Sequence, residues 1–240
     1  LHLSLRRQRQ MCIRDRWWSL LEHLPHQMAQ IKRLAAAIEQ LPENARLPLL
    51  DLMMPALRQL ARPERDAMLA QFQRMIVSDR RVSLHEFVLQ TVLVRRLAAQ
   101  ANRAVRIKYA TVSELKAECL LLFSLLAYVA APLRKETTAS LFMLATQASP
   151  TLILSESDVL GIDALSYSRI KVALDKLNQL APLAKPALIK SLLAIAGEQA
   201  PLPLLLADLL RAICAALEAP MPPAVAAVYT NTGWPAASLS

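Results

Sequence analysis

Apolar residues recur along this chain at steps of three and four residues, the spacing that brings side chains onto one face of an α-helix. In the clearest stretch the apolar positions are Leu20, Leu21, Leu24, Met28, Ile31, Leu34 and Ile38. Glycine occurs only 3 times in 240 residues and aromatic residues make up 5%, whereas the helix formers leucine, alanine, arginine and glutamine are abundant. With 55% apolar residues, the chain can bury a core. The sequence therefore predicts an all-α fold.

Capping boxes and prolines set the expected helix bounds. Ser83 and Glu86 stand three residues apart, so each side chain can bond to the other's backbone N–H at the start of a helix that runs to about Gln100. Thr111 and Glu114 repeat this pattern before the next helix. Further helices are expected at about 17–40 with a break at Pro25, 47–60, 63–78, 136–148, 166–180, 183–197 and 203–218, with Pro42, Pro48 and Pro55 as punctuation.

The most apolar run, Cys119 to Leu133, has to be weighed as a membrane span. Lys116 and Glu118 lie before it and Arg134 follows it, so its uncharged window is 15 residues long. A helix needs about 20 apolar residues to cross the hydrocarbon core. We therefore expect a helix that is buried on all sides within the protein.

The formal net charge of +9 is unevenly distributed. Five arginines against Asp15 place +4 in the first sixteen residues, which leaves +5 for the rest of the chain. No later helix carries basic residues on one face with aromatic residues between them, the pattern that would grip and stack on nucleic acid. We therefore expect no nucleic-acid partner.

Residues 1–16 resemble a translated sequencing-adapter sequence of the kind found at the ends of metagenomic reading frames. The chain begins with Leu1 rather than Met, and no apolar signal-peptide core follows the arginines. We expect residues 1–16 to be a disordered artefact and the natural chain to continue upstream of Trp17.

The chain matches itself at an offset of 120 residues. Leu60-Ala61 aligns with Leu180-Ala181, and the match runs without a gap to Leu97 on Leu217. Arg65 then meets Lys185. This predicts two related helical hairpins around one or two cores, one in a half spanning 17–110 and one in a half spanning 111–223, before a flexible tail at 224–240.

Each hairpin resembles the TerB-like (tellurite-resistance) module, which has a long helix, an Ala-Asp-Gly turn and a second helix with an early glutamate. The first copy keeps Asp79 and Glu86 but has Arg80 in place of the glycine. In the second copy Leu206 stands where the glutamate would be. We interpret Asp79 and Glu86 as turn and capping residues.

Four longer segments resemble the C-terminal extension of some proteobacterial HtpX-like membrane metallopeptidases, metallopeptidase family forty-eight. They are 46–60, 82–90, 118–127 and 208–223, in the right order within 17–223. The resemblance implies a parent protein with a zinc held by an H-E-x-x-H helix, the glutamate acting as general base, and with transmembrane helices.

From this resemblance we expect a non-catalytic accessory or regulatory region of a membrane-bound zinc endopeptidase of membrane-protein quality control. The chain itself would not be an enzyme and would hold no cofactor, since the zinc belongs to the missing catalytic domain. Its partner would be that domain or another protein, at the cytoplasmic face of the bacterial inner membrane. The alternative is a stand-alone TerB-like scaffold that binds a protein at the inner membrane.

The residues most able to do chemistry predict no catalytic, cofactor-binding or metal site. His23 and His26 are three residues apart but flank Pro25, with no third ligand nearby, so we interpret them as surface histidines. The other histidines are His2 and His85, and the cysteines, Cys12, Cys119 and Cys214, form no C-x-x-C pair. Cys119 and Cys214 lie in apolar helices and are expected to be buried. Asp158 and Asp163 flank Gly161 in a loop where they would cap helices.

Overall fold

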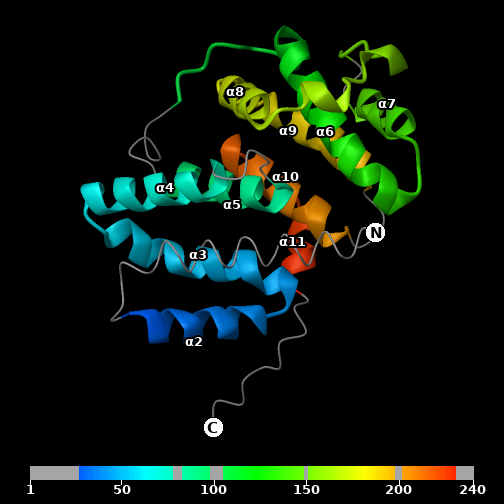
Figure 1. Cartoon of the computed structure of the whole chain (residues 1–240). Coiled ribbons are helices and arrows are strands. Elements are labelled where there is room, and N and C mark those ends of the chain that lie inside the picture. Colours follow the sequence, from blue (N-terminus) through cyan, green and yellow to red (C-terminus); the bar gives the residue numbers. More distant parts are fainter. Residues whose placement is uncertain (1–26, 78–82, 98–104, 149–150, 198–201, 231–240) are drawn as a thin grey trace.

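The computed structural model describes residues 27–77, 83–97, 105–148, 151–197 and 202–230. Within these ranges the chain is all-α and contains no strand, which confirms the predicted fold class (Figure 1). A single bridge joins Tyr109 to Leu180. The helices are α2 (Met28–Glu39), α3 (Glu43–Gln59), α4 (Arg62–Val77), α5 (Leu84–Leu97), α6 (Lys116–Arg134), α7 (Thr138–Ala148), α8 (Tyr167–Leu177), α9 (Lys185–Ala196), α10 (Leu204–Ala216) and α11 (Pro223–Thr230).

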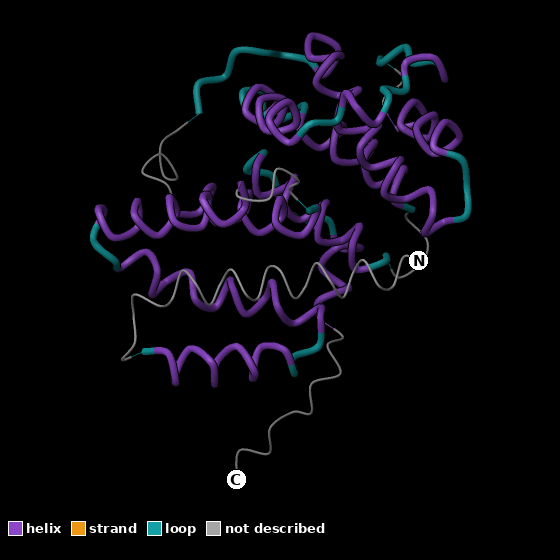
Figure 2. The backbone as a smooth tube through the Cα atoms, in the orientation of Figure 1, coloured by secondary structure: helices purple, strands orange, loops and turns teal. Residues whose placement is uncertain are grey.

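Helices α2 to α5 form layers on one side of the molecule, and α6 to α9 form a second group on the other side, with α10 between them (Figures 1 and 2). Helix α3 continues through Pro48 and Pro55, within the helical stretch 47–60 that the sequence predicted, and begins four residues earlier at Glu43. Each proline removes one backbone hydrogen bond. Burial of the residues just before them, Leu47 and Met54, stabilises the helix across both positions.

The main core lies around α6. Its Leu122, Phe123 and Leu126 are fully buried, and α6 packs against α7, α8 and α9. The Phe123 ring meets Phe142 of α7 edge to face, with 6.3 Å between centroids. Burying one such side chain contributes about 1.5–3 kcal/mol. A smaller cluster, Met54, Leu93 and Leu97, joins α3 to α5.

The apolar helix α6 was predicted to be buried on all sides, and the structure confirms this only in part. Within the run 119–133 only Pro132 and Leu133 are exposed. With the preceding turn, residues Val112–Arg134 form the one described helix that is long and apolar enough to cross a membrane, and half of its most apolar window is buried inside the protein. A core helix has the same length and composition.

The C-terminal region differs from the predicted flexible tail at 224–240. Residues 223–230 form α11, in which Val225 and Tyr229, four residues apart, are buried. Pro223 occupies the first helical position, where its missing N–H costs nothing. The sequence predicted a flexible tail because this region contains prolines and Gly233, although Val225 and Tyr229 form a short apolar face. Residues 231–240, like 1–16, lie outside the described part of the chain.

Three helices recur at the offset of 120 residues. Moved by 120, α5 would span 204–217 and α4 would span 182–197, which are the positions of α10 and α9 within three residues. Helix α3 would span 163–179, which contains α8 and begins four residues before it. The two final helices of these three-helix units, α5 and α10, pack directly against each other.

One corner of each unit is closed by a basic side chain. In the first unit Arg58 Nε donates to the carbonyl of Arg96 at 3.4 Å, and Arg65 Nη1 donates to the carbonyl of Arg58 at 3.2 Å. In the second, Lys185 Nζ donates to Asn178 Oδ1 at 2.9 Å and to the carbonyl of Leu217 at 2.6 Å. Arg65 and Arg58 correspond to Lys185 and Asn178 at the offset of 120. In both units a basic residue therefore joins the end of the first helix to the end of the third.

Candidate functional site

A charged network lies where α10 meets α3, α5 and α11. Arg211 of α10 is 6% exposed and forms an ion pair with Asp51 of α3. Arg96 of α5 pairs with the same carboxylate, its Nη1 2.8 Å from Oδ1. The Arg211 guanidinium also lies over the Tyr229 ring of α11, 4.6 Å from its centroid. Buried charges are costly unless they are paired, so this network stabilises one arrangement of the four helices.

Asp208, one turn before Arg211, is also buried. Its Oδ1 accepts a hydrogen bond from the Tyr229 hydroxyl at 2.7 Å. Burial raises the pKa of Asp208 above its ordinary value, while the Tyr229 hydrogen bond acts in the opposite direction. Burial, followed by the bond to Asp208, also raises the pKa of Tyr229. The pair holds α11 on α10, and neither group lines the two hollows described below.

The corner at Lys185 is different, because it borders a cavity. Lys185 is 9% exposed although it carries an ammonium group, and burial lowers its pKa below the ordinary value. Its two hydrogen bonds go to neutral oxygens, and the nearest carboxylate, Glu218, accepts instead from Asn178 Nδ2 at 3.3 Å. Glu218 has a left-handed backbone, with φ 51°. It stands just after α10 and turns the chain away from the helix.

The cavity has a volume of about 500 Å³ and lies between the ends of α8 and α10 and the beginning of α9. Its walls are mainly apolar, with prolines at the mouth. The polar groups are Lys185, Lys190, Glu218 and Asn178. This size falls in the range of small-molecule pockets, about 300–1,000 Å³. Of the hollows in the described residues, it best combines an apolar wall with a buried charge.

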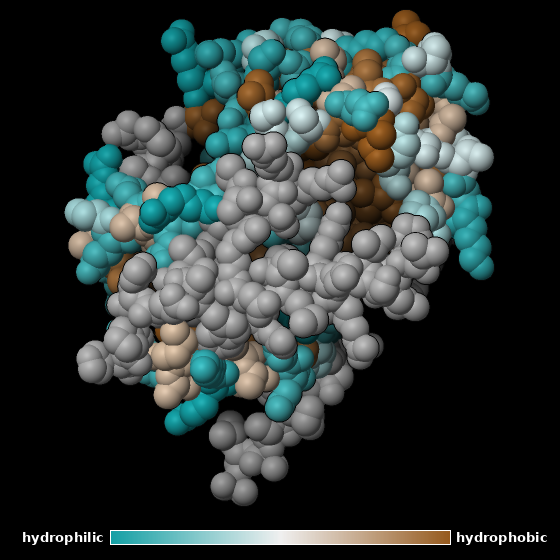
Figure 3. Space-filling model, viewed as in Figure 1, coloured by the Kyte–Doolittle hydropathy of each residue, from teal (hydrophilic) through white to brown (hydrophobic). Residues whose placement is uncertain are grey.

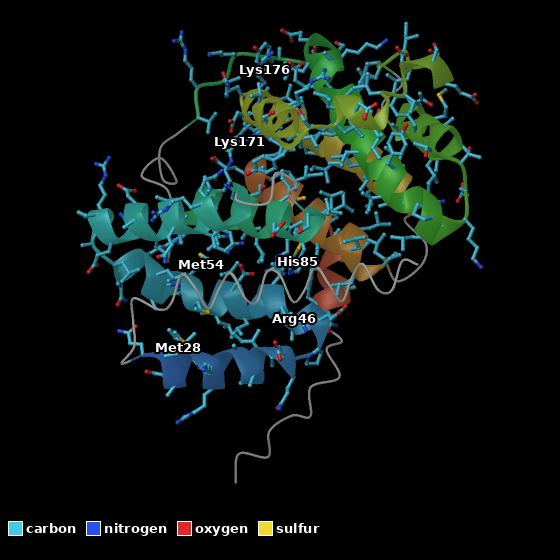
Figure 4. The ribbon with its side chains drawn as sticks, viewed as in Figure 1. Met28, Arg46, Met54, His85, Lys171 and Lys176 are labelled. Carbon is cyan, nitrogen blue, oxygen red and sulfur yellow. The ribbon has the colours of Figure 1, made fainter. Side chains whose placement is uncertain are left out.

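A second hollow of about 260 Å³ lies between α5 and α8. Across it the Tyr167 hydroxyl donates to Gln90, and Arg95 pairs with Asp175. Lys171 lies on its α8 wall (Figure 4). Burial, followed by the charge of Asp175, raises the pKa of Tyr167 to about 12. Two polar pairs join its walls, so we interpret the hollow as the seam between α5 and α8.

The predicted capping residues are found at helix starts. Ser83 and Glu86 exchange hydrogen bonds, Ser83 N to Glu86 Oε2 at 2.7 Å and Glu86 N to Ser83 Oγ at 3.2 Å. Thr111 and Glu114 form the second capping box. These bonds lower the pKa of Glu114. Both predicted capping boxes are confirmed.

The aspartates around Gly161 behave differently from each other. Asp158 caps the short 3₁₀ helix Glu156–Asp158 through Ser155, and the Ser155 backbone bond lowers its pKa. Asp163 is exposed within the next 3₁₀ helix, Ile162–Ala164, whose start shows no side-chain cap. The capping prediction is therefore confirmed for Asp158 alone.

The predicted histidines and cysteines are not brought together in the described residues. His85 is exposed on α5, at the same end of the molecule as Arg46 of α3 (Figure 4). Cys119 and Cys214 are buried as predicted, and burial raises the pKa of each thiol to about 12. His2, Cys12, His23 and His26 lie outside the described part of the chain, as does Asp79. No group of three or more His, Cys, Asp or Glu side chains within the described ranges could hold a metal ion.

The outer helices α2 and α3 leave large apolar side chains uncovered by the described residues. On α2, Leu34 and Ile38 are 56% and 43% exposed and stand one turn apart. Helix α2 contains no buried residue. On α3, Leu52 and Met53 are 78% and 47% exposed. Here we call Leu34, Ile38, Leu52 and Met53 the outer apolar residues.

Large apolar side chains are exposed elsewhere too, among them Leu183 at 95%, Ile153 at 85% and Ile162 at 68%. Figure 3 shows hydrophilic residues over much of the upper helices, with hydrophobic residues coming to the surface along the lower side of α6 in this view. Leu34 and Ile38 are set apart by their place on α2, a helix with no buried residue.

Sequence reasoning missed the buried charges. Asp208 and Arg211 interrupt a run that is otherwise leucine, alanine and isoleucine, and charges inside so apolar a helix indicate burial with a partner. Tyr229, which partners both, was placed in the expected tail. Lys185 gave no comparable signal, because one lysine beside a proline is typical of an exposed helix start.

Comparisons with protein-family models, with curated proteins and with solved structures found no match. The geometry and the sequence therefore carry the functional argument.

Proposed function

We propose that this chain is a non-catalytic helical accessory region that binds the catalytic domain of a membrane-bound zinc metallopeptidase. The observation that carries the proposal is the set of outer apolar residues on α2 and α3. A helix without buried residues contributes little to its own fold, yet Leu34 and Ile38 lie on it at helical spacing. Exposed apolar residues gathered on one element mark contact surfaces.

The position of α2 favours the catalytic domain as the partner. Helix α2 is the first described helix, and the catalytic domain of an HtpX-like parent would be joined on that side of the chain. The outer apolar residues would then face a neighbour that is covalently close, which raises its effective concentration. The four segments that resemble the HtpX-like extension support the same parent.

We also propose that the two three-helix units derive from one TerB-like hairpin pattern. The support is the recurrence of helix positions at 120 residues and the shared basic corner at Arg65 and Lys185. The first copy has Arg80 in place of the module's glycine, and the second copy has Leu206 in place of its glutamate. The second copy therefore lacks the module's acidic residues.

The first test is the genomic sequence upstream of the codon for Trp17. We expect an open frame with an H-E-x-x-H helix and transmembrane segments. A start codon directly before Trp17 would contradict the peptidase parent and favour the stand-alone scaffold at the inner membrane.

The second test uses the full-length parent. The double variant Leu34→Glu, Ile38→Glu should reduce cross-linking between this region and the catalytic domain without unfolding the region, since neither side chain is buried. The matched control is Val172→Glu on α8, which is 55% exposed and lies away from α2. Equal cross-linking in both variants would reject the outer apolar residues as the contact.

A further inference from the structure

We propose that the cavity at Lys185 binds a small amphipathic carboxylate, a molecule with an apolar chain and one anionic head such as a medium-chain fatty acid. The inference is independent of the peptidase parent. It rests on the cavity's shape, its apolar walls and the position of one buried ammonium group.

The walls suit an alkyl chain. Ile107, Leu180, Ile189 and Leu193 line the cavity, and prolines 182, 186, 220 and 222 form much of the remainder. Prolines have no backbone N–H, so these positions offer no donor that an apolar ligand would leave unpaired. Burial of an alkyl chain here would be favourable by about 25 cal/mol per Å² of apolar surface removed from water.

The floor suits a carboxylate head. An ammonium group has three N–H donors, and Lys185 gives two of them to Asn178 Oδ1 and the carbonyl of Leu217. Both acceptors are neutral, so the buried charge has no directly bonded counter-ion. A ligand carboxylate would accept the third donor and supply that charge, forming a charge-assisted hydrogen bond.

The surrounding charges also favour an anion. Lys190, on the next turn of α9, lies at the exposed mouth, and Glu218 is the one carboxylate in the lining. Two ammonium groups against one carboxylate leave +1 in the cavity, and Arg95 adds positive potential at Lys185. The beginning of α9 contributes the positive end of a helix dipole.

The equivalent corner of the first unit sharpens the inference. There Arg65 bonds to a backbone carbonyl at 3.2 Å, and neither it nor Arg58 lines one of the cavities described above. In both units a basic side chain therefore stabilises the contact between helix ends. At the second unit the corner also borders the cavity described above.

The proposal is tested by calorimetric titration of the full chain with decanoate, with decanol and with decyltrimethylammonium, each below its micellar concentration. We expect decanoate to bind at least about tenfold more tightly than decanol, equivalent to about 1.4 kcal/mol, and the cation to bind least. Equal binding of decanoate and decanol would overturn the carboxylate role of Lys185. No decanoate binding at concentrations on the order of 1 mM would overturn the site.

Two variants separate the site from the fold. Lys185→Met removes the ammonium group but also the cap on α10, so its stability has to be measured alongside its affinity. Lys190→Glu reverses an exposed charge at the mouth and should weaken decanoate while leaving stability unchanged. Lys171→Glu, the same reversal on α8 beside the other hollow, is the matched control and should leave decanoate binding unchanged. A loss of the same size in Lys171→Glu and Lys190→Glu would show only general attraction to a basic surface.

Discussion

The two three-helix units use corresponding helix positions in opposite surroundings. In the first, α4 has only partly buried or exposed side chains among those described, and α3 buries only Leu47 and Met54. In the second, α9 and α10 are enclosed by α5, α6, α7 and α11. Helix α10 buries ten residues, including Asp208 and Arg211. The sequence pattern thus determines where the helices form, whereas the helices packed around them determine which residues are buried and stabilise the fold.

The largest difference should appear at the matched positions Leu192 and Phe72. Leu192 in α9 is fully buried, so Leu192→Ala should reduce the free energy of unfolding by about 2–5 kcal/mol. Phe72 in α4 is only partly buried, so Phe72→Ala should cost about 1 kcal/mol, although the residue is larger. Urea unfolding followed by circular dichroism measures both. Equal losses would mean that the two units are equally enclosed.

Ion pairs should show the same contrast on a smaller scale. Arg211→Met removes a buried charge that contacts Asp51 and Tyr229, and should cost about 2–3 kcal/mol, since Asp51 keeps Arg96 as a partner. Arg62→Met breaks the exposed pair of α4, whose Nε–Oδ2 distance to Asp66 is 3.8 Å, and should cost less than about 0.5 kcal/mol. Thermal unfolding of the two variants side by side is the check. If Arg211→Met leaves the stability unchanged, the charged network does not explain the position of α10.

The pH dependence of stability should have opposite signs at a buried and an exposed carboxyl. Burial raises the pKa of Asp208, so the folded state keeps this proton to a higher pH than the unfolded state does. The contribution of Asp208 to stability therefore becomes less favourable as pH rises above its ordinary pKa near 4. Asp208→Asn should therefore gain stability relative to the natural protein between about pH 3 and pH 7.

Hydrogen bonds at its cap lower the pKa of Glu114. The contribution of Glu114 to stability is therefore present above its ordinary pKa and is lost as pH falls. Glu114→Gln should show the opposite trend in the same urea series, and parallel curves for all three proteins would refute both assignments.

The smallest effects on stability are expected at corresponding positions that are exposed in both units. Leu52 and Val172 correspond at the offset of 120 and are 78% and 55% exposed. Leu52→Lys and Val172→Lys should each change the free energy of unfolding by no more than about 0.5 kcal/mol. A large loss in Leu52→Lys alone, measured on the whole chain, would show that residues outside the described ranges cover α3.

Local signals made most of the helices predictable. Ser83, Glu86, Thr111 and Glu114 act within three residues of one another, and their capping bonds depend on no distant partner. The short uncharged window of α6 indicated a core helix, and about half of its most apolar window is buried.

Long-range packing was less accessible. Arg211 meets Asp51 across 160 positions, and Tyr229 of α11 bonds to Asp208 of α10, 21 positions away. The cavity at Lys185 needs the ends of three helices to meet, which no spacing in the sequence encodes. The candidate site therefore depended on tertiary structure, even though every residue in it was visible in the sequence.

The contact between α5 and α10 also has a consequence during synthesis. Helix α5 ends at Leu97 and α10 begins at Leu204, so the α5 face that packs on α10 stays uncovered by it until more than one hundred further residues have been made. At about 5–20 residues per second, this interval is on the order of ten seconds. For that time the nascent chain exposes an apolar helix face to its surroundings, and a chaperone would have a defined segment to hold until α10 has been made.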